Sequence, residues 1–109
     1  MSKPANLVQG TLDLLILKML DLQPMHGWAI LERLKQVSKH TLQVGPGSLY
    51  PALHKLEREG WVQAEWSTSE DKRRVKFYSL SKEGRKRLRV EAADWKRLSS
   101  AITSIVFAK

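Results

Sequence analysis

The sequence contains no cysteine. Disulfide bonds, thiolate metal sites and thiol catalysis are therefore excluded, and this composition is compatible with a reducing cytosol. Long apolar runs are also missing. The most apolar segment, near Leu12, is interrupted by Asp13, Lys18 and Asp21, whereas a membrane span needs about 20 consecutive apolar residues. The first six residues lack the apolar core of a signal peptide. We therefore expect a cytoplasmic protein that has no membrane partner.

The sequence also lacks the residue spacings that are typical of catalytic and metal sites. Its three histidines, His26, His40 and His54, are each fourteen residues apart, which is not a metal-ligand spacing. Glu57 and Glu59 lie close together, but no histidine or nucleophile lies beside them. We expect a protein that is not an enzyme and that needs no cofactor or metal.

Basic residues are abundant but unevenly distributed. The formal net charge is +8, and residues 1–71 contain seven Lys or Arg and eight Asp or Glu. Residues 72–109 contain twelve Lys or Arg and only three Asp or Glu. A local excess of this kind indicates a polyanionic partner. Nucleic acid is the first candidate, and an anionic membrane surface is the second. A basic surface that only keeps the protein soluble is the simpler alternative.

Three helices are predicted in the first sixty residues. The first runs from Thr11 to Leu22 and is nearly all apolar, and the second begins at His26 and is amphipathic through Val37. A third helix ends at Gly60, in a position where glycine caps are common. Its buried stripe is expected to consist of Leu49, Ala52, Leu53 and Leu56.

The start of the third helix has two solutions. Either Pro46 occupies the first turn or Ser48 is the N-cap. The second solution is favoured, because it places Pro51 three positions after the cap, where a missing N–H costs little.

A β-hairpin and a long helix complete the predicted fold. Strands are expected at 61–66 and 75–80, and the loop between them carries Lys72, Arg73 and Arg74. Ser81 is a good N-cap for a last helix that continues to about Phe107, roughly 39 Å long. The fold class is therefore mainly α with a small antiparallel hairpin (α+β), with a winged helix-turn-helix domain at 1–80 and a dimerisation helix at 81–109.

The last helix predicts a homodimer. Its apolar residues are spaced three or four apart, as in a coiled-coil seam. A helix of this length extends beyond a domain of about 80 residues, so its outer half needs a second copy of the chain as a partner. The expected dimerisation residues are Leu88, Ala92, Trp95, Leu98, Ile102, Ile105 and Val106.

The predicted order of elements indicates binding to double-stranded DNA. In a winged helix the third helix can enter the major groove while the hairpin lies along the backbone. Side chains on the solvent face of this helix can reach base edges, and basic side chains of the hairpin can pair with phosphates. The expected base-reading residues are Ser48, Tyr50, His54 and Lys55, and the expected phosphate-binding residues are Lys72, Arg73, Arg74 and Lys76.

Several short motifs together resemble the PadR-like transcriptional regulators. They are His26-Gly27-Trp28, residues 47–53 (Gly-Ser-Leu-Tyr-Pro-Ala-Leu), residues 56–61 (Leu-Glu-Arg-Glu-Gly-Trp), residues 73–78 (Arg-Arg-Val-Lys-Phe-Tyr) and residues 81–85 (Ser-Lys-Glu-Gly-Arg). The resemblance covers almost the whole chain. Within this family the chain is similar to the short subgroup, which has a single C-terminal dimerisation helix. The chain departs from the usual pattern at Trp28, Ser48 and Ser81, and its 67–71 loop lacks the glycines that are common at the wing tip.

The resemblance implies a dimeric bacterial repressor that binds an inverted-repeat operator and is often released by a small aromatic or drug-like effector. It also implies that the start of the third helix and the Arg-Arg wing contact DNA. The implied residues are Ser48, Tyr50, Pro51, His54, Lys55, Arg73, Arg74 and Lys76.

The four tryptophans allow two interpretations. Trp28, Trp61 and Trp66 are expected to fill space in the fold, whereas Trp95 either packs the dimer or contacts an effector between the subunits. Other functions also stay open. A winged helix can serve as a protein–protein interaction module without specific DNA binding, because the fold alone does not dictate function. A weaker alternative is an anti-repressor or a protein that binds membrane surfaces.

Overall fold

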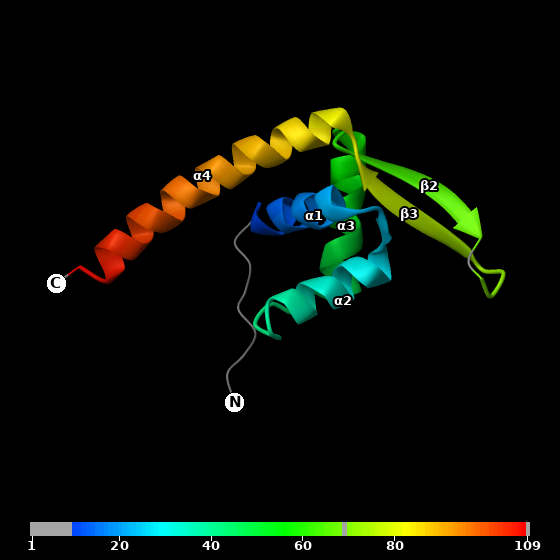
Figure 1. Ribbon diagram of the computed structural model, residues 1–109, viewed down its shortest axis with the longest axis horizontal. Helices are drawn as coiled ribbons and strands as arrows, with labels where there is room; N and C mark the ends of the chain where they lie inside the picture. Colours follow the sequence, from blue (N-terminus) through cyan, green and yellow to red (C-terminus); the bar gives the residue numbers. More distant parts are fainter. Residues whose placement is uncertain (1–9, 69, 109) are drawn as a thin grey trace.

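The computed structural model describes residues 10–68 and 70–108. Three helices, a hairpin and a long final helix follow one another along the chain (Figure 1). This order confirms the expected mainly α fold with a small antiparallel sheet. The elements are α1 (Thr11–Leu22), β1 (Met25–His26), α2 (Gly27–Val37), α3 (Pro46–Arg58), β2 (Val62–Thr68), β3 (Arg74–Leu80) and α4 (Lys82–Val106).

The hydrophobic core joins the three short helices to the base of the hairpin. Ile16 and Leu17 of α1 are completely buried, as is Ile30 of α2. Leu49, Leu53 and Leu56 form the buried stripe of α3, and Val62 begins β2 in the same core. The predicted stripe of α3 is confirmed, with Ala52 packed at its edge.

The sheet has three antiparallel strands in the order β1-β3-β2. In the hairpin, Val62 is paired with Leu80 and Thr68 with Arg74, so both strands are longer than the sequence predicts. The additional strand β1 pairs Met25 with Tyr78. Two residues are too few to show an alternating pattern, and for this reason β1 was not predicted.

The predicted start of α3 at Ser48 is wrong. Gly45 is the N-cap and Pro46 is the first helical residue, because a proline ring has the φ angle that the first turn requires. The Gly45 carbonyl already accepts the N–H groups of Ser48 (3.1 Å) and Leu49 (3.0 Å). Pro51 therefore lies inside the helix. The carbonyl that it leaves without a donor is that of Gly47, and both residues lie on the exposed face, where water can replace the missing N–H.

The end of α3 agrees with the prediction. Gly60 has a φ of 81°, a left-handed conformation that favours glycine. Its N–H donates to the carbonyl of Glu57 (3.0 Å), and the N–H of Trp61 donates to the carbonyl of Leu56 (3.0 Å). These two hydrogen bonds form a Schellman cap, which turns the chain directly into β2.

Two of the tryptophans do not fill space in the core, contrary to the prediction. Trp28 is 61% exposed and Trp66 is 57% exposed, whereas Trp61 is packed against the core. Trp66 lies in the outer half of β2, which is exposed along its length and which the helices do not cover. Trp28 lies on the exposed side of the first turn of α2. The sequence pattern shows alternation in a strand, but not how far the neighbouring layer extends.

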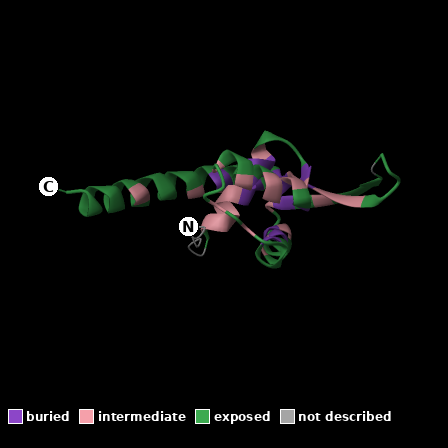
Figure 2. Ribbon diagram, turned by 90° about the horizontal axis from the view of Figure 1, so that it is seen from below, coloured by how far each residue is buried: buried purple, intermediate pink, exposed green. Residues whose placement is uncertain are grey.

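Most of α4 lies outside the body of the molecule. The Ser81 hydroxyl accepts the N–H of Gly84 (3.0 Å) and caps the helix, as predicted. Within the helix only Gly84 and Leu88 are buried, and the outer half is exposed (Figures 1 and 2). Leu88 belongs to the core of its own chain, so the apolar surface left for a second copy begins after it. Within the described ranges no helix is both long and apolar enough to cross a membrane.

Candidate nucleic-acid interface

The outward face of α3 is centred on four residues. Gly47, Pro51, His54 and Arg58 follow one another at steps of four, three and four, which places them on one side of a helix, opposite the leucine stripe. All four are exposed. Arg58 was missing from the predicted set of contacts, although its spacing from Pro51 and His54 was a sufficient signal.

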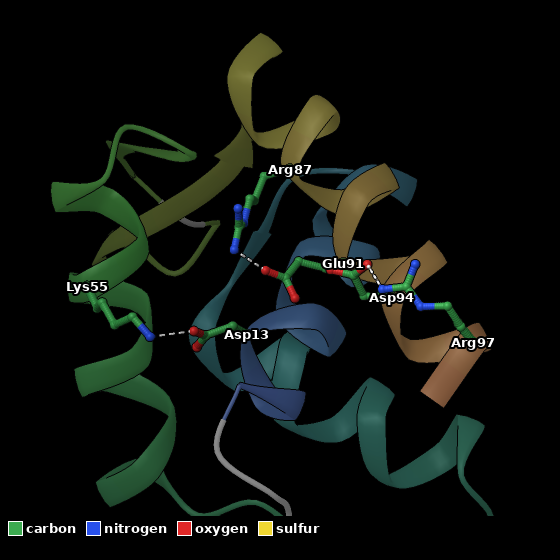
Figure 3. Close-up of polar contacts among 6 residues, drawn as sticks. All are labelled: Asp13, Lys55, Arg87, Glu91, Asp94 and Arg97. Atoms are coloured by element: carbon green, nitrogen blue, oxygen red, sulfur yellow. Dashed lines mark hydrogen bonds and ion pairs between the residues drawn. The ribbon is translucent and has the colours of Figure 1, made fainter. Parts of the chain in front are cut away.

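Lys55 lies on one flank of this face and is held by α1. Its Nζ is 2.6 Å from Oδ2 of Asp13, and the Asp13 side chain is only 18% exposed (Figure 3). Ser48 lies on the same flank, about two turns before Lys55. Because a carboxylate balances the charge of Lys55, we expect it to contribute less to DNA binding than its residue type suggests.

An ion pair within α4 lies beside the pair that Lys55 forms. The Arg87 guanidinium pairs with Glu91 and also lies 4.8 Å from the centre of the Trp61 ring (Figure 3). Arg85 reaches Asp21 of α1 at 3.7 Å. Helix α1 is therefore tied to α3 through Asp13 and to α4 through Asp21.

Tyr50 lies on the opposite flank of α3, next to the start of α2. A Cβ atom at position 27 would lie 2.6 Å from the Tyr50 hydroxyl oxygen, so the ring occupies space that only a glycine at this position leaves free. Tyr50 is 38% exposed. The absence of a side chain at Gly27 therefore leaves room for the Tyr50 ring beside the outward face of α3.

The far end of the hairpin is strongly basic. Lys72, Arg73 and Arg74 are all exposed, and Lys72 has a φ of 63° in the turn. Nε of Arg73 lies 3.5 Å from Oδ2 of Asp71. The guanidinium of Arg74 lies 4.8 Å from the centre of the Trp66 ring, which is the geometry of a cation–π contact.

Lys76 differs from the other basic residues of the hairpin. Its side chain is only 27% exposed, and its Nζ lies 3.4 Å from Oε1 of Glu57 on α3. The same Nζ lies 5.3 Å from the centre of the Tyr78 ring. Lys76 therefore connects the hairpin to α3, which fixes the position of the hairpin relative to that helix.

Tyr78 lies beneath this connection and is 2% exposed. Burial raises the pKa of its phenol above the ordinary value of 10.0, although the charge of Lys76 acts in the opposite direction. The phenol is therefore neutral at neutral pH. Its ring packs in the core that supports the hairpin.

No group of three histidine, aspartate or glutamate side chains is arranged to hold a metal ion in the part of the chain that the structure describes. The side chain of His26 instead caps α2, where its Nδ1 accepts the N–H of Ala29 (3.2 Å). His54 lies on the outward face of α3.

The fold and the position of the basic residues are those expected of a winged helix. The family model described as "Transcriptional regulator PadR-like family" matches residues 16–90, which is more than half of the chain. The chain is a member of the PadR-like family of transcriptional regulators. This membership makes it a DNA-binding regulator, and it confirms the resemblance seen in the sequence.

Solved structures support the PadR-like fold over nearly the whole chain. An X-ray structure of a PadR-like transcription factor from Bacteroides fragilis is 30% identical, with a TM-score of 0.74, and covers 88% of this chain and 90% of that one. A transcriptional regulator from Clostridium thermocellum has a TM-score of 0.82 at 24% identity, with coverage of 93% and 96%. At that identity the second match supports the fold alone.

A curated relative with higher identity is much longer. It is an uncharacterized 37.1 kDa protein in transposon TN4556 of Streptomyces fradiae, and it is 42% identical over 79 residues. The match covers 72% of this chain but only 21% of that relative. The PadR-like unit of this chain thus corresponds to one part of a larger protein there.

Proposed function

We propose that this PadR-like regulator is a repressor that binds an inverted-repeat operator as a homodimer. The observation that carries the proposal is the combination of an exposed α3 face with a basic hairpin end. The ion pair between Lys76 and Glu57 joins the hairpin to α3. Pro51, His54 and Arg58 meet base edges in the major groove, and Arg73 and Arg74 pair with phosphates. Ser48, Tyr50 and Lys55 contact the flanks of the groove, and Lys72 adds to the charge of the hairpin end.

The homodimer is supported by the exposed apolar surface of α4. Trp95 is 44% exposed and Ile102 is 48% exposed, although both are large apolar residues. They share one face of the helix with Ala92, Leu98, Ile105 and Val106, and no part of the described chain covers this face. Pairing through this face would present two α3 helices to successive turns of DNA, about 34 Å apart.

The dimer interface also supports an effector as a secondary proposal. Trp95 lies near the middle of α4, where it would approach the partner's Trp95 in a symmetric dimer. Two indole rings that face each other offer walls for a small aromatic or drug-like molecule. Plain packing of the two rings against each other is the competing role.

The test of the operator proposal is a titration against duplex DNA at several salt concentrations. We expect tighter binding to the protein's own upstream region than to random duplex. Arg73→Ala with Arg74→Ala should weaken binding to both duplexes. Since each lost phosphate contact removes about 0.9 from the salt slope, four contacts in a dimer correspond to a loss of up to roughly 3.6. Lys96→Ala with Arg97→Ala is the matched control, because it removes the same charge from the exposed outer half of α4.

A second variant separates base reading from charge. His54→Ala should reduce the affinity for the upstream duplex more than the affinity for random duplex. Equal affinity of the wild-type protein for both duplexes would exclude sequence-specific binding. It would then favour the alternative function, a winged helix that serves as a protein–protein interaction module.

A further inference from the structure

A groove of about 440 Å³ lies between the start of α2, the Tyr50 flank of α3 and the hairpin. Trp28, Tyr50 and Trp66 contribute aromatic rings to its lining, and each comes from a different element. This volume is within the range of pockets that hold small molecules. No residue of α4, the helix that carries Trp95, lines this groove.

The two tryptophans of this groove are not explained by the fold. Trp28 and Trp66 leave more than half of their surface exposed, although large aromatic side chains normally stabilise a protein by burial. Neither belongs to the hydrophobic core. Exposed indole rings that line a common groove are typical of a binding site for a flat apolar group.

The groove is also positively charged. Arg74 and Lys76 line it, whereas no aspartate or glutamate does. Lys76 is balanced by Glu57, but Arg74 has no carboxylate partner within the described ranges. Its guanidinium instead lies over the Trp66 ring, which positions a cation at the edge of an aromatic wall.

We propose that this groove binds a small planar aromatic anion, for example a carboxylate with one or two fused rings. The indole walls would stack on the ring, and Arg74 would pair with the negative group. Duplex DNA offers the negative group but not the aromatic ring. Its phosphates can use Arg74, but its bases are stacked inside the helix and offer no ring to Trp28 and Trp66.

The ligand would act on the same residues that the proposed function assigns to DNA. Arg74 belongs to the basic hairpin end, and Tyr50 lies on the flank of α3. An anion on Arg74 neutralises a charge that would otherwise pair with a phosphate. A ligand in this groove would therefore compete with DNA directly, with no change of the dimer. This consequence rests on the proposed function, whereas binding in the groove does not.

The experiment is an NMR titration of the ¹⁵N-labelled full-length protein with 2-naphthoate, in which the indole N–H signals of the four tryptophans are followed. We expect the signals of Trp28 and Trp66 to shift and that of Trp61, which is packed against the core, to stay. Trp28→Leu should weaken binding roughly tenfold, because stacking on one ring is lost. Phe107→Leu is the matched control, since it removes an exposed aromatic ring from another surface and should leave the affinity unchanged.

The charge requirement is tested with the neutral isostere 2-naphthamide. The wild-type protein should bind it several times more weakly than 2-naphthoate, and Arg74→Gln should remove that difference. Equal affinity of the wild-type protein for the acid and the amide would overturn the proposal, as would shifts confined to Trp95. Shifts of Trp28 and Trp66 with the upstream duplex but not with millimolar naphthoate would also overturn it and would make the groove a DNA contact.

The same samples separate this proposal from the operator proposal. Fluorescence anisotropy of a labelled upstream duplex should show weaker DNA binding when naphthoate is added. If the protein binds no duplex, the proposed function fails, but the indole shifts still decide whether the groove binds the anion.

Discussion

Gly84→Ala tests how the start of α4 is fixed to the winged-helix domain. A Cβ atom at this position would lie 2.0 Å from the carbonyl oxygen of Trp61 and 2.7 Å from Cδ1 of Leu80. Because a carbon and an oxygen come no closer than about 3.3 Å, the backbone must shift by more than about 1 Å. Two hydrogen bonds hold the backbone at this position and oppose such a shift. The Trp61 carbonyl also accepts the N–H of Ser81 (3.1 Å), and the Ser81 hydroxyl donates to the Gly60 carbonyl (2.7 Å).

The magnitude follows from three contributions. Alanine stabilises a helix interior by about 1 kcal/mol relative to glycine. Forcing a methyl group into an occupied site costs about 1–3 kcal/mol. Weakening the hydrogen bonds of Ser81 to Trp61 and Gly60 costs about 1 kcal/mol each. The variant should therefore be less stable than the wild type by about 2–4 kcal/mol, which corresponds to a Tm lower by roughly 10 °C or more.

Gly47→Ala is the matched control for this substitution. Gly47 is also helical, but no atom lies within 4 Å of a Cβ at that position, so this variant should be as stable as the wild type or slightly more stable. Both variants are compared by circular dichroism at one protein concentration, because the melting temperature of a dimer depends on concentration. A Gly84→Ala protein that is as stable as the wild type would refute the reasoning.

Three further predictions concern the ion pairs, the buried tyrosine and the exposed helix. A double-mutant cycle with Asp13→Asn and Lys55→Gln should give a coupling of about 0.5–1 kcal/mol in urea unfolding at low salt, since Lys55 is half exposed; no coupling would mean that the pair does not hold α3. The raised pKa of Tyr78 means that its stabilising contribution is complete below pH 10 and is lost as the pH rises through the folded-state pKa, so the wild type should lose more stability than Tyr78→Phe above pH 10. Parallel unfolding curves of the two proteins between pH 9 and 11 would contradict this. Ile102→Asp should convert the proposed dimer to a monomer in sedimentation velocity, because it places a charge in the middle of the α4 face. An unchanged sedimentation coefficient would argue against pairing through this face.

The limits of helices and strands were largely readable from the sequence, because they depend on local chemistry. Ser81 as an N-cap and Gly60 as a left-handed C-terminal residue were predicted and confirmed. The start of α3 was wrong because two local rules conflicted. One rule favours a proline such as Pro51 near a helix start, and the other favours a proline such as Pro46 in the first turn. The structure follows the second rule, so Pro51 lies inside the helix.

The sequence by itself determined that the chain forms a winged helix with a long apolar-striped final helix, because periodicity and caps act over a few residues. Only the tertiary structure decided which side chains are available at the surface. It paired Lys55 with Asp13 and Lys76 with Glu57, which takes two expected DNA contacts into ion pairs across elements. It also left Trp28 and Trp66 exposed around a basic groove, because α2, α3 and the hairpin meet there without covering them. Such pairings join residues that are distant in sequence, and no local pattern records them.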